Sequence, residues 1–354
     1  MKAFDDAYRG RRVLVTGHTG FKGSWLVQWL LQLGAEVAGY SLDIPSQPSN
    51  FELLGLDQRI RHYIGDIRDP QKLAAAIDEF KPDVVFHLAA QALVRRSYAD
   101  PVGTFETNTM GMVQLLECVR QREWISAAIL ITSDKAYRND EWCWGYREID
   151  ALGGHDPYSS SKSCADLIAQ SYVYSFMREG KTRVAITRAG NVIGGGDWAT
   201  DRLVPDILRA FEKSQPVIIR NPHATRPWQH VLEPLSGYLM LAERLYADGQ
   251  IFAEGWNFGP NDADAQPVKW IVSALASAWG DAAKWQVAAG EHPHEAHHLK
   301  LDISKAKARL AWQPRWNLPT ALNHITTWHQ AWLNKQPVRE LCHTQIQQYI
   351  STQA

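Results

Sequence analysis

Short apolar runs rich in β-branched residues alternate with longer apolar segments through the first half of the chain. Such runs are typical of strands buried in a parallel sheet, and the longer segments are typical of helices. We expect strands at residues 12–16, 36–42, 61–65, 84–88, 127–132 and 184–187, and helices over 24–33, 69–80 and 104–121. Alternating strands and helices predict an α/β fold, a Rossmann-like doubly wound parallel sheet.

The pattern changes near residue 188, where glycine and proline become frequent. This break predicts a Rossmann domain over residues 1–187, with a returning segment at about 231–258, and a smaller α+β C-terminal domain over the remainder of 188–354. In a chain of 354 residues, two such domains predict a site in the cleft that they share. Residues 334–354 have the composition of a polar terminal extension.

The first predicted strand leads directly into a glycine-rich turn. Gly17, Gly20 and Gly23 follow it and open a helix, as a tight turn and a close approach of the backbone to a pyrophosphate require. Asp43 stands 20 residues after Gly23, where a carboxylate accepts both hydroxyls of an adenosine ribose and repels a 2′-phosphate. The 1–187 domain is therefore predicted to bind NAD and not NADP, although Asp43 also fits an ordinary turn before Pro45.

Other positions predicted to line this cofactor lie in the same turn or at the ends of later strands, where Asp66 is expected to face adenine. These positions are His18, Thr19, Phe21, Lys22, Asp66, Ile67, Leu88, Ala89 and Ala90.

Ser133, Asp134 and Lys135 stand at the end of the strand predicted at 127–132. Open α/β sheets bind their ligands at the carboxyl ends of the strands, so these three polar side chains predict a catalytic row. A solvated strand end is the alternative interpretation.

Tyr158 and Lys162 lie four positions apart in a predicted helix and therefore share one face. The unperturbed pKa of a phenol is ~10, and an ammonium group beside it favours the phenolate and lowers that pKa. The pair predicts a catalytic base. A chance pair on a helix is the alternative interpretation.

Arginine and aromatic side chains are interleaved early in the second domain. Arginine forks suit a diphosphate and aromatic rings suit a nucleobase. Because the rest of the domain is not basic, we favour a single nucleotide-linked ligand over a DNA groove. The residues are Arg188, Arg202, Arg220, Arg226, Trp198, Trp228 and His230. The 15 tryptophans, several beside proline or glycine, also suggest walls around a pocket.

Charge and cysteine content narrow the class of protein. The chain carries 37 Lys and Arg against 38 Asp and Glu, which favours neither nucleic acid nor a membrane surface as a partner. The four cysteines lack C-x-x-C spacing, so we expect reduced thiols in the cytoplasm, and no apolar run is long enough to span a bilayer. We expect no metal, because a histidine cluster lacks helical spacing and a partner carboxylate pair. It comprises His292, His294, His297 and His298.

Several motifs together resemble the extended short-chain dehydrogenase/reductase family. They are Gly17-x-x-Gly20-x-x-Gly23, His87-Leu88-Ala89-Ala90, Asn108, the Ser133 row and Tyr158-x-x-x-Lys162. Segments 225–231 and 301–312 resemble the C-terminal signatures of its nucleotide-sugar enzymes. The family's sugar-nucleotide 4,6-dehydratases carry Thr-Asp-Glu where this chain has Ser133-Asp134-Lys135. This triplet, with segments 95–98 and 194–198, resembles the branch that acts on CDP-glucose.

The resemblance implies tightly held NAD, a nucleotide-sugar substrate (CDP-D-glucose) and a cytoplasmic homodimer or homotetramer built on helix pairing. It also implies a role in deoxysugar biosynthesis, such as that of lipopolysaccharide O-antigen. The expected substrate contacts are Gln91, Arg96, Asn108, Arg188, Asn191, Asp197, Trp198, Arg202, Arg220, Arg226, Trp228 and His230.

The implied reaction is dehydration of CDP-D-glucose to CDP-4-keto-6-deoxy-D-glucose. Tyr158 takes the proton of the 4-hydroxyl, Ser133 hydrogen-bonds that oxygen, and Asp134 protonates the departing 6-hydroxyl. Lys162 lowers the pKa of the phenol and holds the nicotinamide ribose, so Tyr158 and Lys162 also belong to the expected cofactor site. Lys135 is the candidate base at carbon 5, provided that it is uncharged. The alternatives are a nucleotide-sugar 4-epimerase, which needs no acid and base at carbons 5 and 6, a 4,6-dehydratase for another nucleotide-sugar, and a non-catalytic dinucleotide sensor.

Overall fold

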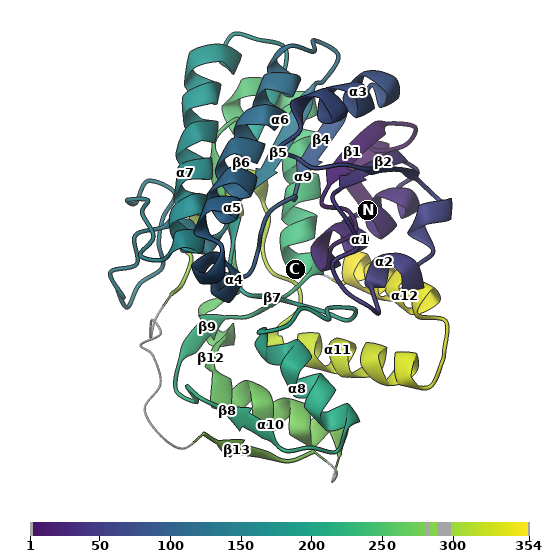
Figure 1. Cartoon of the computed structure of the whole chain (residues 1–354), viewed down its shortest axis with the longest axis vertical. Coiled ribbons are helices and arrows are strands. Elements are labelled where there is room, and N and C mark those ends of the chain that lie inside the picture. Colours follow the sequence, from purple (N-terminus) through teal and green to yellow (C-terminus); the bar gives the residue numbers. More distant parts are fainter. Residues whose placement is uncertain (1–2, 281–282, 289–298, 353–354) are drawn as a thin grey trace.

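The computed structural model describes residues 3–280, 283–288 and 299–352. Its described part is organised around a seven-stranded sheet in the order β11-β6-β5-β4-β1-β2-β3 (Figure 1). Every neighbouring pair in this sheet is parallel, so the predicted doubly wound α/β fold is confirmed. The strands are β1 (Arg12–Thr16), β2 (Glu36–Ser41), β3 (Arg61–Ile64), β4 (Val84–His87), β5 (Ala127–Ile131), β6 (Arg183–Ala189) and β11 (Gly255–Phe258).

Helices cover both faces of the sheet. Along β1, Val13 and Val15 belong to one apolar core and Leu14 belongs to the other, as the alternation of side chains along a strand requires. The first core is closed by α1 (Phe21–Gln32), α9 (Leu232–Asp248) and α12 (Val338–Ser351). The second is closed by α3 (Pro70–Phe80), α6 (Gly111–Arg120) and α7 (Pro157–Tyr172). Three short helices, α2 (Asn50–Leu53), α4 (Val94–Ala99) and α5 (Pro101–Phe105), lie in the connections.

The prediction of a polar terminal extension over residues 334–354 is wrong. Residues 338–351 form α12, which packs against α1 (Figure 1). Its buried side chains recur on one helical face and include Val338, Cys342, Ile346 and Tyr349. This helix therefore belongs to the first core, together with α1 and α9.

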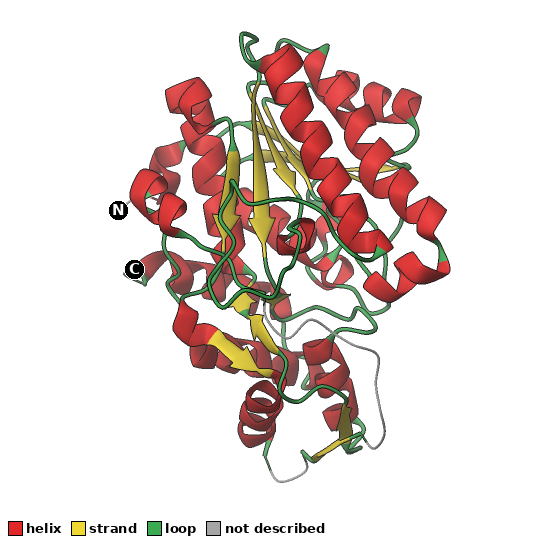
Figure 2. Ribbon diagram, turned by 90° about the vertical axis from the view of Figure 1, so that its left-hand side faces the viewer, coloured by secondary structure: helices red, strands yellow, loops and turns green. Residues whose placement is uncertain are grey.

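A smaller body lies below the sheet, on the side to which the strand arrows point (Figure 2). Its apolar core includes residues of three helices, and short strand pairs complete it. The helices are α8 (Leu203–Glu212), α10 (Val268–Trp279) and α11 (Leu318–Leu333). The strand pairs are β8 (Val217–Ile219) with β13 (Trp285–Val287), β9 (Thr225–Pro227) with β12 (Ala265–Pro267), and β7 (Val192–Ile193) with β10 (Gln229–His230).

Tryptophans have more than one place in the structure. Trp25, Trp29, Trp256 and Trp328 are among the largest fully buried side chains of the described residues, so these four fill the core. Trp144 instead lines a hollow with Arg147 and Asp150.

Candidate active site

The catalytic row predicted at the end of β5 forms a short 3-10 turn, Asp134–Ala136. The Ser133 hydroxyl caps this turn, because it accepts a hydrogen bond from the Lys135 amide at 3.2 Å and donates one to Asp134 Oδ1 at 3.0 Å. Asp134 is buried, and its second carboxylate oxygen, Oδ2, has no hydrogen-bond partner among the described residues. Burial raises the pKa of Asp134, while Lys135 opposes the rise. The turn thus presents a carboxyl group that tends to keep its proton.

Tyr158 and Lys162 lie on the buried face of α7, as their spacing predicts. The helix begins at Pro157, and Asp156 caps it by accepting a hydrogen bond from the Ser159 amide at 3.0 Å. The Lys162 ammonium lies 3.5 Å from the carbonyl oxygen of Ile131, the last residue of β5. The start of α7 and the end of β5 therefore face each other.

The predicted effect of Lys162 on Tyr158 is wrong for the protein alone. Burial raises the pKa of Tyr158, and the groups that oppose the rise are Ser133, through a hydrogen bond, and Arg202. Burial also lowers the pKa of Lys162, to about 8. In the protein alone, burial therefore favours the protonated phenol.

Two further cations, Lys22 and Arg226, act on this site from separate elements. Lys22, in the first turn of α1, has its pKa lowered to about 7 by burial and by the nearby charges of Arg202 and Lys162, while Asp134 opposes the shift. Arg226, on β9, lowers the pKa of Asp134 against the effect of burial. Positive side chains from both bodies of the chain thus converge on Asp134.

The glycine turn after β1 brings backbone segments into close approach. Gly17 has a φ of 74°, and a Cβ added there would lie 2.7 Å from the Ala89 amide nitrogen. A Cβ at Gly23 would lie 2.2 Å from the Gly17 carbonyl oxygen. The Thr19 hydroxyl donates to the Asp43 carbonyl oxygen at 2.6 Å, which fixes the turn to the end of β2, where Asp43 is exposed. Only glycine fits the two crowded positions.

Two other predicted cofactor positions have side chains that are already engaged. The ring of His18 is buried and lies between Ser41, at 2.8 Å, and His62, at 2.6 Å. His18 can thus meet a cofactor only through its backbone. The carboxylate of Asp66 is held by the guanidinium of Arg68 at 2.7 Å.

Phe21 is partly buried against the first core, and Ile67 is buried in the second. Three residues follow β4, namely Leu88, Ala89 and Ala90. The Leu88 amide donates to the Thr16 carbonyl oxygen at 3.0 Å. The Ala89 amide donates to the Thr16 hydroxyl at 3.2 Å. The chain after β4 is thereby fixed beside the glycine turn.

Gln91 and Asn108 hold each other. The Gln91 amide donates to the Asn108 side-chain oxygen at 2.8 Å, and the Asn108 amide group donates to the Gln91 carbonyl at 3.0 Å and to the Ser161 hydroxyl at 2.9 Å. The Gln91 side chain is engaged with Leu93 and Thr104. These contacts connect the segment after β4 to α7, so both residues have a role in positioning the backbone.

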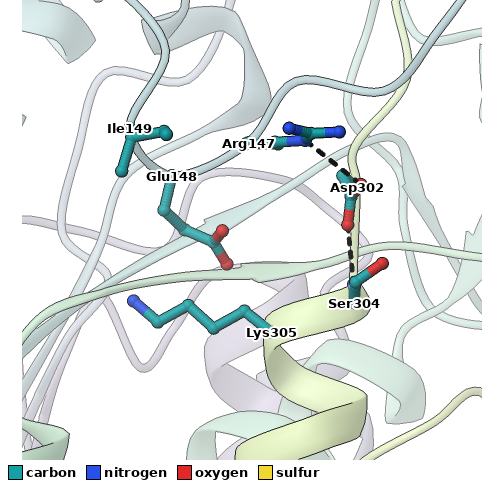
Figure 3. A pocket seen from close by; sticks show the side chains of 6 residues that line it. All are labelled: Arg147, Glu148, Ile149, Asp302, Ser304 and Lys305. Carbon is teal, nitrogen blue, oxygen red and sulfur yellow. Dashed lines mark hydrogen bonds and ion pairs between the residues drawn. The ribbon is translucent and has the colours of Figure 1, made fainter.

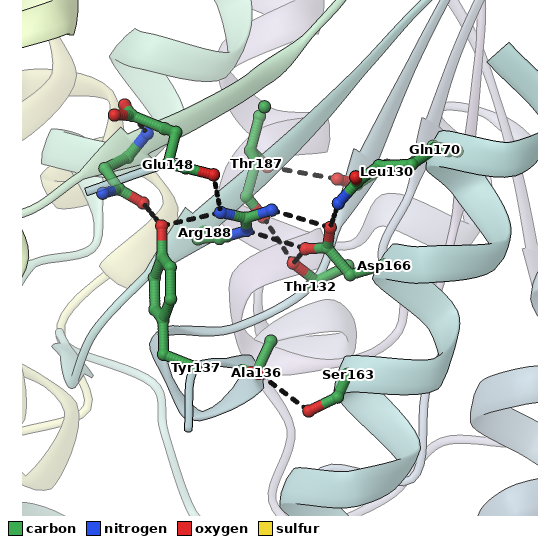
Figure 4. A network of polar contacts seen from close by, with 12 residues as sticks. Leu130, Thr132, Ala136, Tyr137, Glu148, Ser163, Asp166, Gln170, Thr187 and Arg188 are labelled. Carbon is green, nitrogen blue, oxygen red and sulfur yellow. Dashed lines mark hydrogen bonds and ion pairs between the residues drawn. The ribbon is translucent and has the colours of Figure 1, made fainter. Parts of the chain in front are cut away.

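Two predicted substrate contacts lie in the interior, and these predictions are wrong. Arg188, at the end of β6, is 1% exposed and donates to both carboxylate oxygens of Asp166 at 2.8 Å (Figure 4). Its remaining nitrogen donates to the Tyr137 hydroxyl, which leaves no free fork for a diphosphate. His230 is fully buried, and its ring packs against Trp316 at a centroid distance of 4.9 Å.

The other predicted substrate contacts vary in exposure. Trp198 and Trp228 are buried; Trp198 packs against Trp328, and the Trp228 indole donates to the Gln266 carbonyl oxygen at 3.0 Å. Asp197 is buried and pairs with Arg202 at 3.1 Å. Arg96 on α4 and Arg220 after β8 are exposed, and Asn191 is half-buried between β6 and β7. The four histidines of 292–298 lie outside the described residues.

The motifs in the sequence did not indicate the buried polar residues that lie next to the catalytic row, chiefly Asp166 and Tyr137. A signal existed for Asp166, because it follows Lys162 by four positions and shares the same buried helix face. A hollow of about 280 Å³ lies beside Glu148, and no predicted site residue lines it (Figure 3). Its lining residues are Arg147, Glu148, Ile149, Asp302, Ser304 and Lys305.

The parallel sheet, the glycine turn and the Tyr158–Lys162 face of α7 form the arrangement expected of an extended short-chain dehydrogenase/reductase, and the sequence relatives bear this out. Within that class the chain belongs to the GDP-mannose 4,6 dehydratase family, whose family model matches residues 14–325.

Two relatives show the range of activities around this chain. It is 55% identical over 349 residues to CDP-glucose 4,6-dehydratase of Salmonella typhimurium, with 97% of each chain covered. It is 24% identical to UDP-glucose 4-epimerase of Mycoplasma pneumoniae, covering 92% of this chain and 98% of that protein.

Solved structures agree on the fold. A dTDP-glucose 4,6-dehydratase from Bacillus anthracis in complex with NAD has a TM-score of 0.77 at 21% identity, covering 93% of this chain and 100% of that one. A UDP-glucose-4-epimerase from Stenotrophomonas maltophila with bound NAD has a TM-score of 0.80 at 21% identity, covering 92% and 99%. Because dehydratases and epimerases share this fold, the choice between them depends on sequence identity and on the side chains of the site.

Proposed function

We propose that the chain converts CDP-D-glucose to CDP-4-keto-6-deoxy-D-glucose and water, with NAD regenerated in each turnover. The observation that carries this proposal is the 55% identity, over 97% of both chains, to CDP-glucose 4,6-dehydratase of Salmonella typhimurium. Within the site, the unpartnered buried oxygen of Asp134 supports it, because a dehydration needs an acid that a 4-epimerisation does not.

The glycine turn fits a dinucleotide. Gly17 and Gly23 allow the backbone to approach closely, and no side chain caps the first turn of α1, which leaves the helix N-terminus available for a pyrophosphate. Asp43, exposed at the end of β2, suits the adenosine ribose. We infer that these residues hold NAD, which when bound accepts a hydride from carbon 4 of the sugar and returns it to carbon 6.

Tyr158 and Ser133 act on the 4-hydroxyl of the sugar. Tyr158 accepts the hydroxyl proton as carbon 4 is oxidised, and Ser133 donates a hydrogen bond to the same oxygen. Since burial raises the pKa of Tyr158, the phenol needs nearby positive charge to act, and Arg202 already works in that direction. Lys162, buried behind the phenol on the same helix face, is placed to hold the nicotinamide ribose.

Asp134 and Lys135 serve the elimination. Oxidation at carbon 4 acidifies the proton on carbon 5, which Lys135 removes in its uncharged form, and Asp134 protonates the departing 6-hydroxyl so that it leaves as water. The Lys135 ammonium then returns a proton to carbon 5 as the hydride reaches carbon 6. Burial raises the pKa of Asp134, so its carboxyl keeps a proton to higher pH than an ordinary aspartate. Lys135 and Arg226 oppose this rise.

Arg202 and Arg226 are the cations placed to hold the diphosphate of the nucleotide-sugar. They come from the start of α8 and from β9, and each acts electrostatically on a catalytic side chain, Arg202 on Tyr158 and Arg226 on Asp134. A diphosphate bound there would lie next to the catalytic row.

We further infer a cytoplasmic homo-oligomer, a homodimer or homotetramer. The four cysteines are free, which suits a reducing compartment, and none of the helices in the described ranges is long and apolar enough to cross a membrane. Apolar side chains are exposed on α5, on α7 and just after α7, a face suited to burial against a second copy. These are Val102, Leu167, Tyr174 and Phe176.

Incubation of the purified protein with NAD and, separately, CDP-glucose, dTDP-glucose, UDP-glucose and GDP-mannose tests the assignment. We expect the base-induced absorbance of a 4-ketose, with loss of water in the mass spectrum, from CDP-glucose alone. A CDP-sugar of unchanged mass and inverted carbon 4 would identify a 4-epimerase instead. Conversion of another nucleotide-sugar in preference to CDP-glucose would contradict the substrate.

A further inference from the structure

A buried ion pair lies directly behind the catalytic side chains. Asp166 on α7 and Arg188 at the end of β6 are 0% and 1% exposed. Arg188 Nε and Nη2 each donate to one oxygen of the Asp166 carboxylate at 2.8 Å, in the two-pronged geometry of a strong pair (Figure 4). Burial alone would lower the pKa of Arg188, but the hydrogen bonds and charge of Asp166 outweigh it and raise that pKa. Arg188 is therefore held in its charged form.

The pair contacts the catalytic row on both of its sides. Immediately before Ser133, the Thr132 hydroxyl donates to Asp166 Oδ2 at 3.0 Å. Shortly after Lys135, the Tyr137 hydroxyl accepts from Arg188 Nη1 at 2.7 Å. The 3-10 turn that carries the row is thus fixed at each end to the same two charges (Figure 4).

The same contacts extend to β11 and to two loop segments. The Tyr137 hydroxyl donates to the side-chain oxygen of Asn257, on β11, at 2.8 Å. The Asn257 amide group donates to the carbonyl oxygens of Tyr146 at 2.8 Å and Asp302 at 3.1 Å. Arg188 Nη1 also donates to the Glu148 carbonyl oxygen at 3.1 Å. One connected network therefore runs from α7, through the catalytic turn, to segments 146–148 and 302.

Asp166 also acts on Lys162, one helical turn before it. The charged or titratable groups that act on the Lys162 ammonium are Asp166 on its own helix, Lys22 on α1 and His87 on β4. Of these, Asp166 is the acidic group, and it favours the charged form of Lys162 against the effect of burial. The pair thus influences both the position of the Ser133–Asp134–Lys135 turn and the charge of Lys162.

Stability does not by itself account for such a pair. Desolvation of two buried charges offsets much of their attraction, and apolar residues of similar volume are often equally stable in such a position. A pair that fixes two catalytic elements relative to each other has a geometric use, because small displacements of reacting groups cost large factors in rate.

We propose that the Asp166–Arg188 pair is the positioning element of this active site, which holds α7, with Tyr158 and Lys162, in register with the Ser133–Asp134–Lys135 turn. The pair touches no substrate itself. The proposal rests on the proposed function where it concerns turnover, but its second test requires no turnover.

Arg188→Lys is the first test, since it keeps the positive charge and loses the two-pronged contact with Asp166. We expect kcat for CDP-glucose to fall about 10- to 100-fold, the scale of a catalytic misplacement of roughly 1 Å, with KM changed less than about threefold. Tyr137→Phe, which removes one hydroxyl from the network and keeps the ring, should lower kcat in the same sense and by less.

Arg122→Lys is the matched control. Arg122, after α6, makes the same two-pronged contact, with Asp78 Oδ1 and Oδ2 at 2.7 Å. It precedes β5 and so stands at the opposite end of that strand from the catalytic row. Its kcat should stay within about twofold of the parent, as expected for a site outside the network. An equal loss of kcat in Arg122→Lys and Arg188→Lys, or a loss in Arg188→Lys confined to KM, would overturn the proposal.

The second test uses Asp166→Asn without substrate. Competitive labelling with acetic anhydride, followed by peptide mass spectrometry, gives the pH at which Lys162 becomes reactive. In the parent this midpoint is expected at about 8. In the variant it should move about one unit lower, because the carboxylate that stabilises the ammonium is gone. An unchanged midpoint would overturn the link between Asp166 and Lys162.

The two tests separate the two proposals. A parent protein without dehydratase activity, whose Lys162 midpoint still responds to Asp166→Asn, would refute the proposed function and leave the network in place. An active parent with no response in either Arg188→Lys or Asp166→Asn would do the reverse. If Asp166→Asn does not fold, Arg188→Lys and Tyr137→Phe decide the matter.

Discussion

Asp134→Asn is the substitution that bears most directly on the elimination step. The asparagine keeps the size and shape of the aspartate, and its side-chain oxygen can still accept the hydrogen bond that Ser133 donates at 3.0 Å. What it loses is the acidic proton at the second position, where Oδ2 has no partner among the described residues. The change therefore isolates the acid role from the geometry of the turn.

The expected magnitude follows from that isolation. A positioned general acid contributes a factor of about 10² to 10⁴, or roughly 3 to 5 kcal/mol of activation free energy, and kcat should fall by that factor. KM should change less than about threefold, because a carboxyl whose role is proton transfer adds little to ground-state binding. The amide group left without a partner in a buried place should cost about 1–3 kcal/mol of folding stability, which thermal unfolding measures separately.

The pH profile provides the second signature. Because burial raises the pKa of Asp134, the parent holds the active, protonated form at low pH and loses it as pH rises through that pKa. This loss of kcat with rising pH should disappear from the residual activity of Asp134→Asn. A 4-ketose assay across pH, with solvent-deuterium exchange at carbon 5 in parallel, separates the steps. The carbon 5 proton should still exchange, since Lys135 is unchanged. Turnover within about tenfold of the parent would refute the role of Asp134 as the acid.

Three further substitutions test the other roles. Tyr158→Phe keeps the ring and removes the proton acceptor, so kcat should fall by about two to four powers of ten with little change in nucleotide-sugar binding, and near-normal turnover would point to another base. Lys135→Met should abolish both elimination and deuterium exchange at carbon 5, and exchange at the parental rate would remove Lys135 as the base. Arg226→Ala should weaken CDP-glucose binding by roughly 1.5–3 kcal/mol and NAD binding much less in calorimetry, whereas equal losses would place Arg226 outside the sugar-nucleotide site.

The sheet could be predicted from the sequence almost strand by strand. The run at residues 12–16 matches β1, and the runs at 61–65 and 127–132 end within one residue of β3 and β5. Strands buried on both faces leave a continuous apolar signal, and a glycine or a cap marks the neighbouring helix ends. The catalytic row and the Tyr158–Lys162 face were predictable for the same reason, since each follows from its place on one element.

Long-range pairing was not predictable. Arg188 stands in the sequence among arginines and aromatic residues that suit a ligand, but β6 carries its side chain into the interior, where its partner comes from α7. His18 likewise lies in a cofactor motif, while its ring is held by Ser41 and His62 from two other strands. No local pattern reveals a partner contributed by a distant segment.

The C-terminal helix shows a different kind of failure. Its apolar positions, Val338, Cys342, Ile346 and Tyr349, recur at a helical period that could have been read from the sequence. Because polar residues between these positions dominate the composition of residues 334–354, the composition indicated an extension and not a helix. The effect of Lys162 on Tyr158 failed for an energetic reason, because desolvation of a buried phenol outweighs the charges that the protein alone supplies.

Transfer of the hydrogen on carbon 4 tests the central claim most directly. CDP-glucose carrying deuterium at carbon 4 is converted in ordinary water with NAD, and the product is examined by NMR. The account predicts a 4-keto-6-deoxy product in which the deuterium has moved to carbon 6, and the same reaction of unlabelled substrate in D2O should place solvent deuterium on carbon 5. A product that retains its 6-hydroxyl, or one whose carbon 6 carries no deuterium, would contradict it.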